Sequence, residues 1–175
     1  MFDFGLEGYR PRWLNGRAAV TAAQGPRLRS LVGRPLSGVR LVWDLQDDEW
    51  FCDCPVLLDF DGEQVELNHS RLDDLSITWN SIDPRGPVRW DGFDLRWRRD
   101  ERSEAHALQG QLLQDVELLT WAGRRPVRRS RDPDLGTVDV HFRFPRGGLT
   151  VLNALDENGL AFGPPAPTYR RHPLR

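Results

Sequence analysis

VLLDFDGEQVEL, residues 56–67, has the pattern of a β-hairpin. Apolar residues stand at every second position on both sides of Asp61-Gly62, a dipeptide that favours a tight turn. Successive strand residues point to opposite faces of a sheet, so one face of this hairpin is apolar. A two-residue turn and a four-residue turn keep the same inner face. That face carries Val56, Leu58, Phe60, Val65 and Leu67.

A rough copy of this hairpin returns as VDVHFRFPRGGLTV, residues 138–151, where residues 145–148 suggest a four-residue turn. Similar stretches precede the two hairpins, at residues 31–43 and 108–121, and similar Asp-rich stretches follow them, at 71–79 and 154–162. Three agreements in the same order indicate a degenerate internal duplication. One repeat would cover about residues 31–82 and the other about residues 108–163.

The sequence therefore predicts a mainly β protein, or an α+β protein with a minor helical part. Two similar antiparallel units share one core, and residues 1–175 form a single domain. Residues 17–24 favour a helix that ends at Gly25-Pro26, and residues 26–33 add another turn. VRWDGFDLRWRR, residues 88–99, predicts a further hairpin that turns at Asp91-Gly92 and places Trp90 and Phe93 in the core. The proline-rich tail, residues 164–175, is expected to lack regular structure.

Composition limits the class of protein. With 175 residues, 39% apolar and 10% aromatic, the chain can bury a core and is not a disordered segment. It has no run of eighteen apolar residues and no signal-like start, so we expect a cytoplasmic protein that does not enter a membrane. Its two cysteines are too few for a disulfide framework.

The basic residues exclude several enzyme classes. All 24 of them are arginine, so the chain has no P-loop lysine and no Schiff-base lysine. No Gly-x-Ser-x-Gly motif is present. We find no catalytic signature and expect no cofactor.

Charge is distributed in blocks along the chain. Residues 8–43 contain seven arginines and no acid, whereas residues 44–74 contain eleven acids and one base, Arg71. If the two blocks do not neutralise each other in the fold, the second forms a negative patch with aromatic anchors at its edge. The patch would consist of Asp44, Asp47, Asp48, Glu49, Asp53, Asp59 and Asp61, with Trp50 and Phe51 as anchors.

Such a patch is how a protein captures a basic partner. We therefore expect a non-catalytic intracellular binding protein whose partner is a basic protein, in the manner of an inhibitor or immunity protein. One alternative is a metal-dependent enzyme that uses Asp59 and Asp61 together with Asp73 and Asp74.

A second alternative is nucleic-acid binding through an arginine-rich loop. A net charge of −2 and a pI of about 6.1 disfavour a dedicated duplex binder. The loop would use Arg124, Arg125, Arg128, Arg129 and Arg131.

Cys52, Cys54 and His69 form the last candidate site. Residues two apart on a strand share a face, and either hairpin turn brings His69 near the two cysteines. Three soft ligands could begin a zinc site, but the sequence offers no fourth ligand. We therefore predict no metal.

Overall fold

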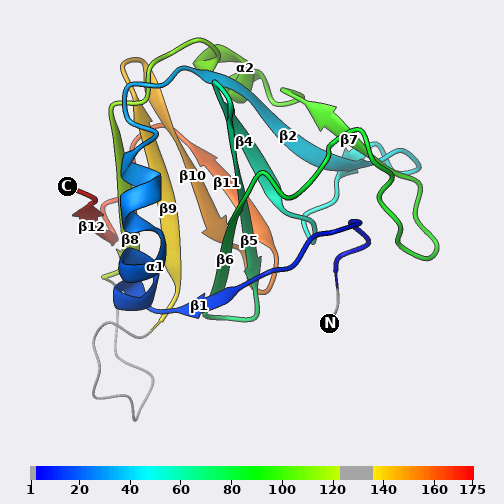
Figure 1. Ribbon diagram of the computed structural model, residues 1–175, viewed down its shortest axis with the longest axis horizontal. Helices are drawn as coiled ribbons and strands as arrows, with labels where there is room; N and C mark the ends of the chain where they lie inside the picture. The colour runs from blue at the N-terminus through cyan, green and yellow to red at the C-terminus, as the bar shows by residue number, and fades with distance from the viewer. Residues whose placement is uncertain (1–2, 123–135) are drawn as a thin grey trace.

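The computed structural model describes residues 3–122 and 136–175, and the protein is mainly β (Figure 1). The described part contains two antiparallel sheets. The first has the order β1 (Trp13–Asn15), β6 (Asp74–Trp79), β5 (Glu63–Ser70), β4 (Val56–Phe60), β2 (Leu36–Asp44) and β3 (Glu49–Trp50), and β7 (Leu95–Arg99) also pairs with β2. The second has the order β11 (Asn158–Phe162), β10 (Gly147–Asn153), β9 (Val138–Phe144), β8 (Asp115–Trp121) and β12 (Tyr169–Pro173).

Two helices flank the sheets. Helix α1 (Arg17–Arg29) lies alongside β8 and β1, and helix α2 (Ser103–Leu108) lies against β2 and β10 (Figure 1). No helix in the described ranges combines the length and the apolar character that crossing a membrane requires.

The hairpin at residues 56–67 forms as its pattern predicts. Phe60 pairs with Glu63, so the turn is the two-residue form, and Gly62 takes the positive φ of 84° that this turn needs. In the second hairpin Phe144 pairs with Gly147, so the four-residue turn suggested there is wrong. Common descent of the two halves stays a prediction.

The inner faces of the two sheets form one core. Phe60 of β4 stacks on Phe144 of β9 with ring centroids 6.5 Å apart and an interplanar angle of 10°. Val20 and Leu28 of α1 join the same core and are fully buried. Burial of one such side chain stabilises the fold by about 1.5–3 kcal/mol.

A smaller apolar cluster covers the outer face of the first sheet. The N-terminal segment and the loop before β7 supply its cover, through Phe4, Leu6, Tyr9 and Val88. The first sheet is therefore buried on both faces along much of β4 and β5.

The predicted end of the first helix is wrong. Helix α1 continues through Pro26 to Arg29, although proline removes one helical hydrogen bond. Leu28 lies beyond the proline and is fully buried in the core. Packing of this side chain keeps the last turn helical, because tertiary contacts override local propensity.

The predicted hairpin at residues 88–99 is also wrong. The turn at Asp91-Gly92 forms, but Leu95 pairs with Asp44 of β2, and Val88 bridges to Leu6. Residues Arg40–Asp44 of the nine-residue strand β2 give β7 a longer ladder of backbone hydrogen bonds than the local hairpin would. Phe93 consequently stays 46% exposed outside the core.

The expectation of an irregular tail fails as well. Residues Tyr169–Pro173 form β12, which pairs with β8, and Leu174 enters the main core. The prolines at positions 164, 165 and 167 precede the strand and do not interrupt it. The tail covers an edge of the second sheet that would otherwise expose unpaired backbone groups.

Candidate functional site

The residues of the predicted acidic patch occupy several different environments. Asp44 is buried at the end of β2, where its carboxylate accepts a hydrogen bond from the Gln46 amide at 2.8 Å. Asp48 accepts a hydrogen bond from the Trp43 indole at 2.9 Å and forms an ion pair with Arg98 at 3.3 Å. These two carboxylates are therefore engaged within the protein.

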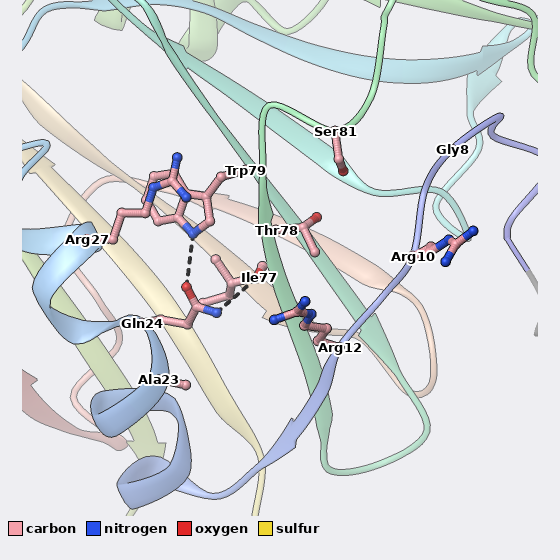
Figure 2. Close-up of a pocket in the computed structure, with 10 residues that line it drawn as sticks. All are labelled: Gly8, Arg10, Arg12, Ala23, Gln24, Arg27, Ile77, Thr78, Trp79 and Ser81. Atoms are coloured by element: carbon pink, nitrogen blue, oxygen red, sulfur yellow. Dashed lines mark hydrogen bonds between the residues drawn. The ribbon is translucent and has the colours of Figure 1, made fainter.

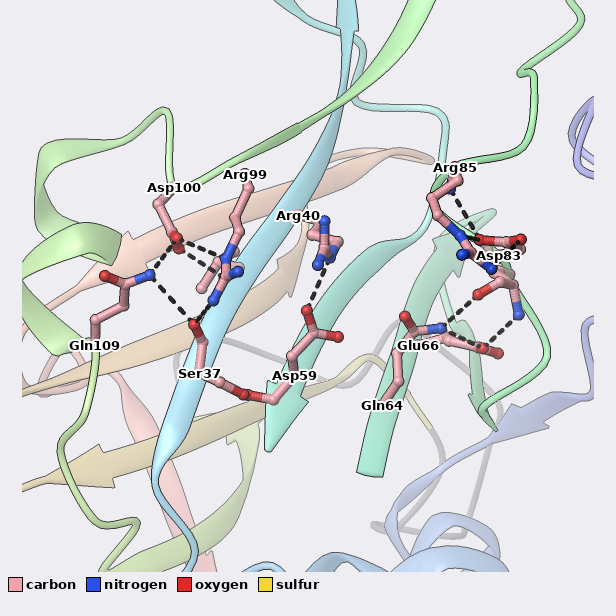
Figure 3. A network of polar contacts seen from close by, with 12 residues as sticks. Ser37, Arg40, Asp59, Gln64, Glu66, Asp83, Arg85, Arg99, Asp100 and Gln109 are labelled. Carbon is pink, nitrogen blue, oxygen red and sulfur yellow. Dashed lines mark hydrogen bonds and ion pairs between the residues drawn. The ribbon is translucent and has the colours of Figure 1, made fainter. Parts of the chain in front are cut away.

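Arginines from the basic block, residues 8–43, neutralise part of the acidic block, residues 44–74. Arg40 forms an ion pair with Asp59 at 2.8 Å (Figure 3), and Arg27 forms one with Glu63 at 3.0 Å. Asp61 is exposed at the tip of the β4–β5 hairpin. It lies at the opposite end of β4 from Asp53, which places it roughly 16 Å away along the strand.

A smaller group of carboxylates remains together around Cys52. Burial, together with the nearby carboxylates of Glu157, Asp53 and Glu49, raises the pKa of the Cys52 thiol to about 11. Two of these carboxylates come from the first sheet and its β3–β4 loop, whereas Glu157 comes from the β10–β11 turn of the second sheet. The sequence prediction missed Glu157.

Asn158 brings this turn to the first sheet. Its backbone amide donates to the Cys52 carbonyl at 3.1 Å, and its side-chain amide donates to the carbonyls of Cys52 and Cys54 at 3.0 Å each. The side-chain oxygen of Asn158 accepts a hydrogen bond from the His69 amide at 2.8 Å. Buried polar groups that are paired in this way fix the two sheets relative to each other.

We call Glu49, Asp53 and Glu157 the acidic face. All three are exposed, and within residues 3–122 and 136–175 none of them has an ion-pair partner. Partial burial raises the pKa of Asp53. The acidic face therefore carries negative charge that has no ion-pair partner in the described part of the chain.

The aromatic anchors differ from the predicted ones. Trp50 is half-buried and packs against the main core, so it is not a surface anchor. Phe51 is half-buried, with its ring centroid 4.9 Å from those of Trp90 and Phe93. Apolar surface beside the acidic face comes from Phe93, which is 46% exposed, and from Leu155, which is 82% exposed.

The candidate metal ligands do not point to a common centre. The Cys54 thiol donates to the Phe4 carbonyl at 3.7 Å, and the Cys52 thiol donates to the Trp50 carbonyl at 3.5 Å. The His69 Nε2 atom lies 3.1 Å from the Val138 carbonyl. The described part of the chain holds no group of three or more His, Cys, Asp or Glu side chains that could bind a metal.

Two further sites are predicted from the sequence: a carboxylate cluster for a metal-dependent enzyme and an arginine-rich loop for nucleic-acid binding. Asp59 and Asp61 lie at one end of the β4–β5 hairpin, whereas Asp73 and Asp74 lie at the β5–β6 turn, with the eight residues of β5 between the two pairs. The structure does not bring these carboxylates together. The predicted basic loop, with Arg124, Arg125, Arg128, Arg129 and Arg131, lies outside the described residues.

Comparison with known proteins gives no further information: no family model matches the chain, and no similar protein is found among curated proteins or solved structures.

Proposed function

We propose that this protein is a non-catalytic intracellular binding protein that captures a basic protein partner through the acidic face. The observation that carries the proposal is the convergence of unpaired carboxylates from both sheets around Cys52. Glu157 lies beside Glu49 and Asp53 because Asn158 joins its turn to the first sheet. A cationic surface that covers these carboxylates supplies the ion-pair partners that the described part of the chain does not.

Charge and apolar surface have separate roles in this proposal. Exposed carboxylates attract a basic partner over a distance and raise the association rate about 10- to 1000-fold. Exposed apolar side chains, here Phe93 and Leu155, add affinity once water leaves the contact. Arg98 neutralises Asp48 and limits the face on the side of β7.

A charge-neutral variant tests the proposal. The variant combines Glu49→Gln, Asp53→Asn and Glu157→Gln. Its control combines Glu7→Gln, Asp61→Asn and Glu104→Gln, which changes the net charge equally at exposed positions outside the face. The partner is recovered from the native cell by affinity capture, purified, and its association rate measured at low and at high salt.

We expect the face variant to slow association about tenfold at low salt, because long-range attraction sets the rate. The control variant should associate like the wild type, and the difference should shrink at high salt. Equal rates for the two variants, or association that does not depend on salt, would refute a role for the acidic face.

A further inference from the structure

A pocket of about 470 Å³ is lined in part by arginines of the basic block, residues 8–43. Helix α1, strand β6 and the N-terminal residues 8–12 form its walls (Figure 2). β1 pairs with Asp74, Leu75 and Ser76, and the chain before Trp13 then diverges from β6. The second half of β6, at Ile77, Thr78 and Trp79, is therefore left to line an open hollow.

The pocket is cationic. Its lining contains Arg10, Arg12 and Arg27 and no carboxylate. The Arg27 guanidinium lies 4.5 Å from the ring centroid of Trp79 and 3.0 Å from Glu63, so it is held in place and partly neutralised. Arg10 and Arg12 have no ion-pair partner in the described part of the chain. Figure 2 shows Arg12 reaching toward Ile77 and Gln24.

The remaining polar groups are oriented by the protein. Gln24 donates to the Ile77 carbonyl at 3.0 Å and accepts from the Trp79 indole at 2.9 Å. The hydroxyls of Thr78 and Ser81 both donate to the buried carboxylate of Glu66.

Glu66 therefore fixes what the two hydroxyls offer to a ligand. Its carboxylate also accepts from the Gln64 amide group (Figure 3) and from the backbone amides of Ser81 and Ile82. A hydroxyl has one proton and two lone pairs, so Thr78 and Ser81 can only accept hydrogen bonds from the pocket side. The pocket thus combines guanidinium donors with hydroxyl acceptors.

We propose that this pocket binds a phosphomonoester of a small hydroxylated molecule, the class to which sugar phosphates belong. A phosphomonoester carries a charge of about −1.5 to −2 at neutral pH, which matches two unpaired guanidinium groups. Its phosphate oxygens accept paired hydrogen bonds from arginine, and its hydroxyls donate to Thr78 and Ser81. The volume lies within the range of about 300–1,000 Å³ that is usual for small-molecule sites.

Glucose 6-phosphate is the probe for this site. The thermal unfolding midpoint of the full chain is measured with glucose 6-phosphate, inorganic phosphate or glucose, at constant ionic strength. We expect glucose 6-phosphate to raise the midpoint by about 5–10 °C when its concentration is about 100 times its dissociation constant. Inorganic phosphate should bind at least tenfold more weakly, and glucose should have no effect.

Paired variants separate the pocket from general charge effects. Arg10→Gln with Arg12→Gln should lose at least tenfold in affinity, measured by titration calorimetry. Arg89→Gln with Arg96→Gln removes two exposed arginines elsewhere and should keep wild-type affinity. The acidic-face variant should also keep it, so failure of that proposal does not affect this one.

Three results would overturn the proposal. The first is the absence of both a midpoint shift and a calorimetric signal with glucose 6-phosphate at millimolar concentration. The second is equal affinity for inorganic phosphate and glucose 6-phosphate, because the hydroxyls of Thr78 and Ser81 would then contribute nothing. The third is equal loss of affinity in the two arginine variants.

Discussion

At the scale of single residues, two buried histidines make the stability of the fold depend on pH. Burial lowers the pKa of His69 even though Asp139 lies nearby, and burial lowers the pKa of His141 to about 4. His141 is held by Thr150, with 2.9 Å between its Nδ1 atom and the threonine hydroxyl. Both rings are therefore neutral in the folded protein at pH 7, whereas in the unfolded chain a histidine titrates near pH 6.5.

We predict that the free energy of unfolding falls as the pH is lowered from 7 to 5. Between pH 6.5 and about 4 the unfolded chain binds more protons than the folded chain at His141, so acid favours unfolding. Between pH 7 and pH 5 the contribution of His141 is about 1–2 kcal/mol. Urea unfolding at the two pH values measures it.

The variant His141→Gln isolates this contribution. It removes the titrating ring while leaving His69 and Asp139 unchanged, so its unfolding free energy should depend less steeply on pH than that of the wild type. Burial raises the pKa of Asp139, which works in the opposite direction in acid, and this term is common to both proteins. Parallel pH profiles would show that His141 carries no such linkage.

At the scale of elements, the last strand closes one side of the second sheet. β12 pairs with β8 over Tyr169–Pro173, and Arg171 of this strand forms an ion pair with Glu117 at 2.6 Å. Leu174 follows directly and is 7% exposed within the main core. Its amide donates to the Val116 carbonyl at 3.0 Å, so backbone and side chain both anchor the end of the chain.

We predict that Leu174→Ala lowers the free energy of unfolding by about 2 kcal/mol, near the lower limit for loss of a buried leucine. The matched control is Leu155→Ala, because Leu155 is 82% exposed and its loss should change stability by less than about 0.5 kcal/mol. Urea unfolding of the two variants gives both values. Equal effects would mean that burial of Leu174 does not anchor β12 to the main core.

The same elements show what the sequence can predict. Alternation every second residue identifies β4, β5, β9 and β10, because each of these strands has one apolar face against the core. β7 and β12 depend instead on the edges that other strands leave open, and a local pattern does not contain that information. For the same reason the local hairpin signal at Asp91-Gly92 correctly indicates a turn but not the pairing partner of Leu95.

The candidate site also combines residues that the sequence predicts with a residue that only the tertiary structure brings in. Glu49 and Asp53 lie in the acidic block of the sequence, and their exposure is expected for a loop. Glu157 joins them from a distant segment through the hydrogen bonds of Asn158. One signal was present: the alignment of residues 71–79 with 154–162 marks a second acidic turn. Its contact with the first acidic block depends on how the sheets face each other, which charge counts do not reveal.

At the scale of the whole molecule, the packing of the two sheets against each other supports both proposed sites. The two central hairpins face each other through Phe60 and Phe144, and Phe142 lies beside them with its centroid 6.0 Å from that of Phe60. Helix α1, which forms one wall of the arginine pocket, packs into the same core through Val20 and Leu28. Loosening this contact should therefore disturb the acidic face and the pocket together.

We predict that Phe60→Ala and Phe144→Ala each lower the free energy of unfolding by about 3–5 kcal/mol. The double variant should lose about 0.5–1.5 kcal/mol less than the sum, because each ring contributes only while the other is present. The control cycle pairs Phe144→Ala with Val88→Ala, since Val88 belongs to the separate cluster on the outer face of the first sheet. Its effects should add within about 0.5 kcal/mol. If the Phe60–Phe144 cycle is additive as well, the two rings do not stabilise each other. If fluorescence and circular dichroism report separate transitions for the wild type, the two sheets do not unfold as one unit.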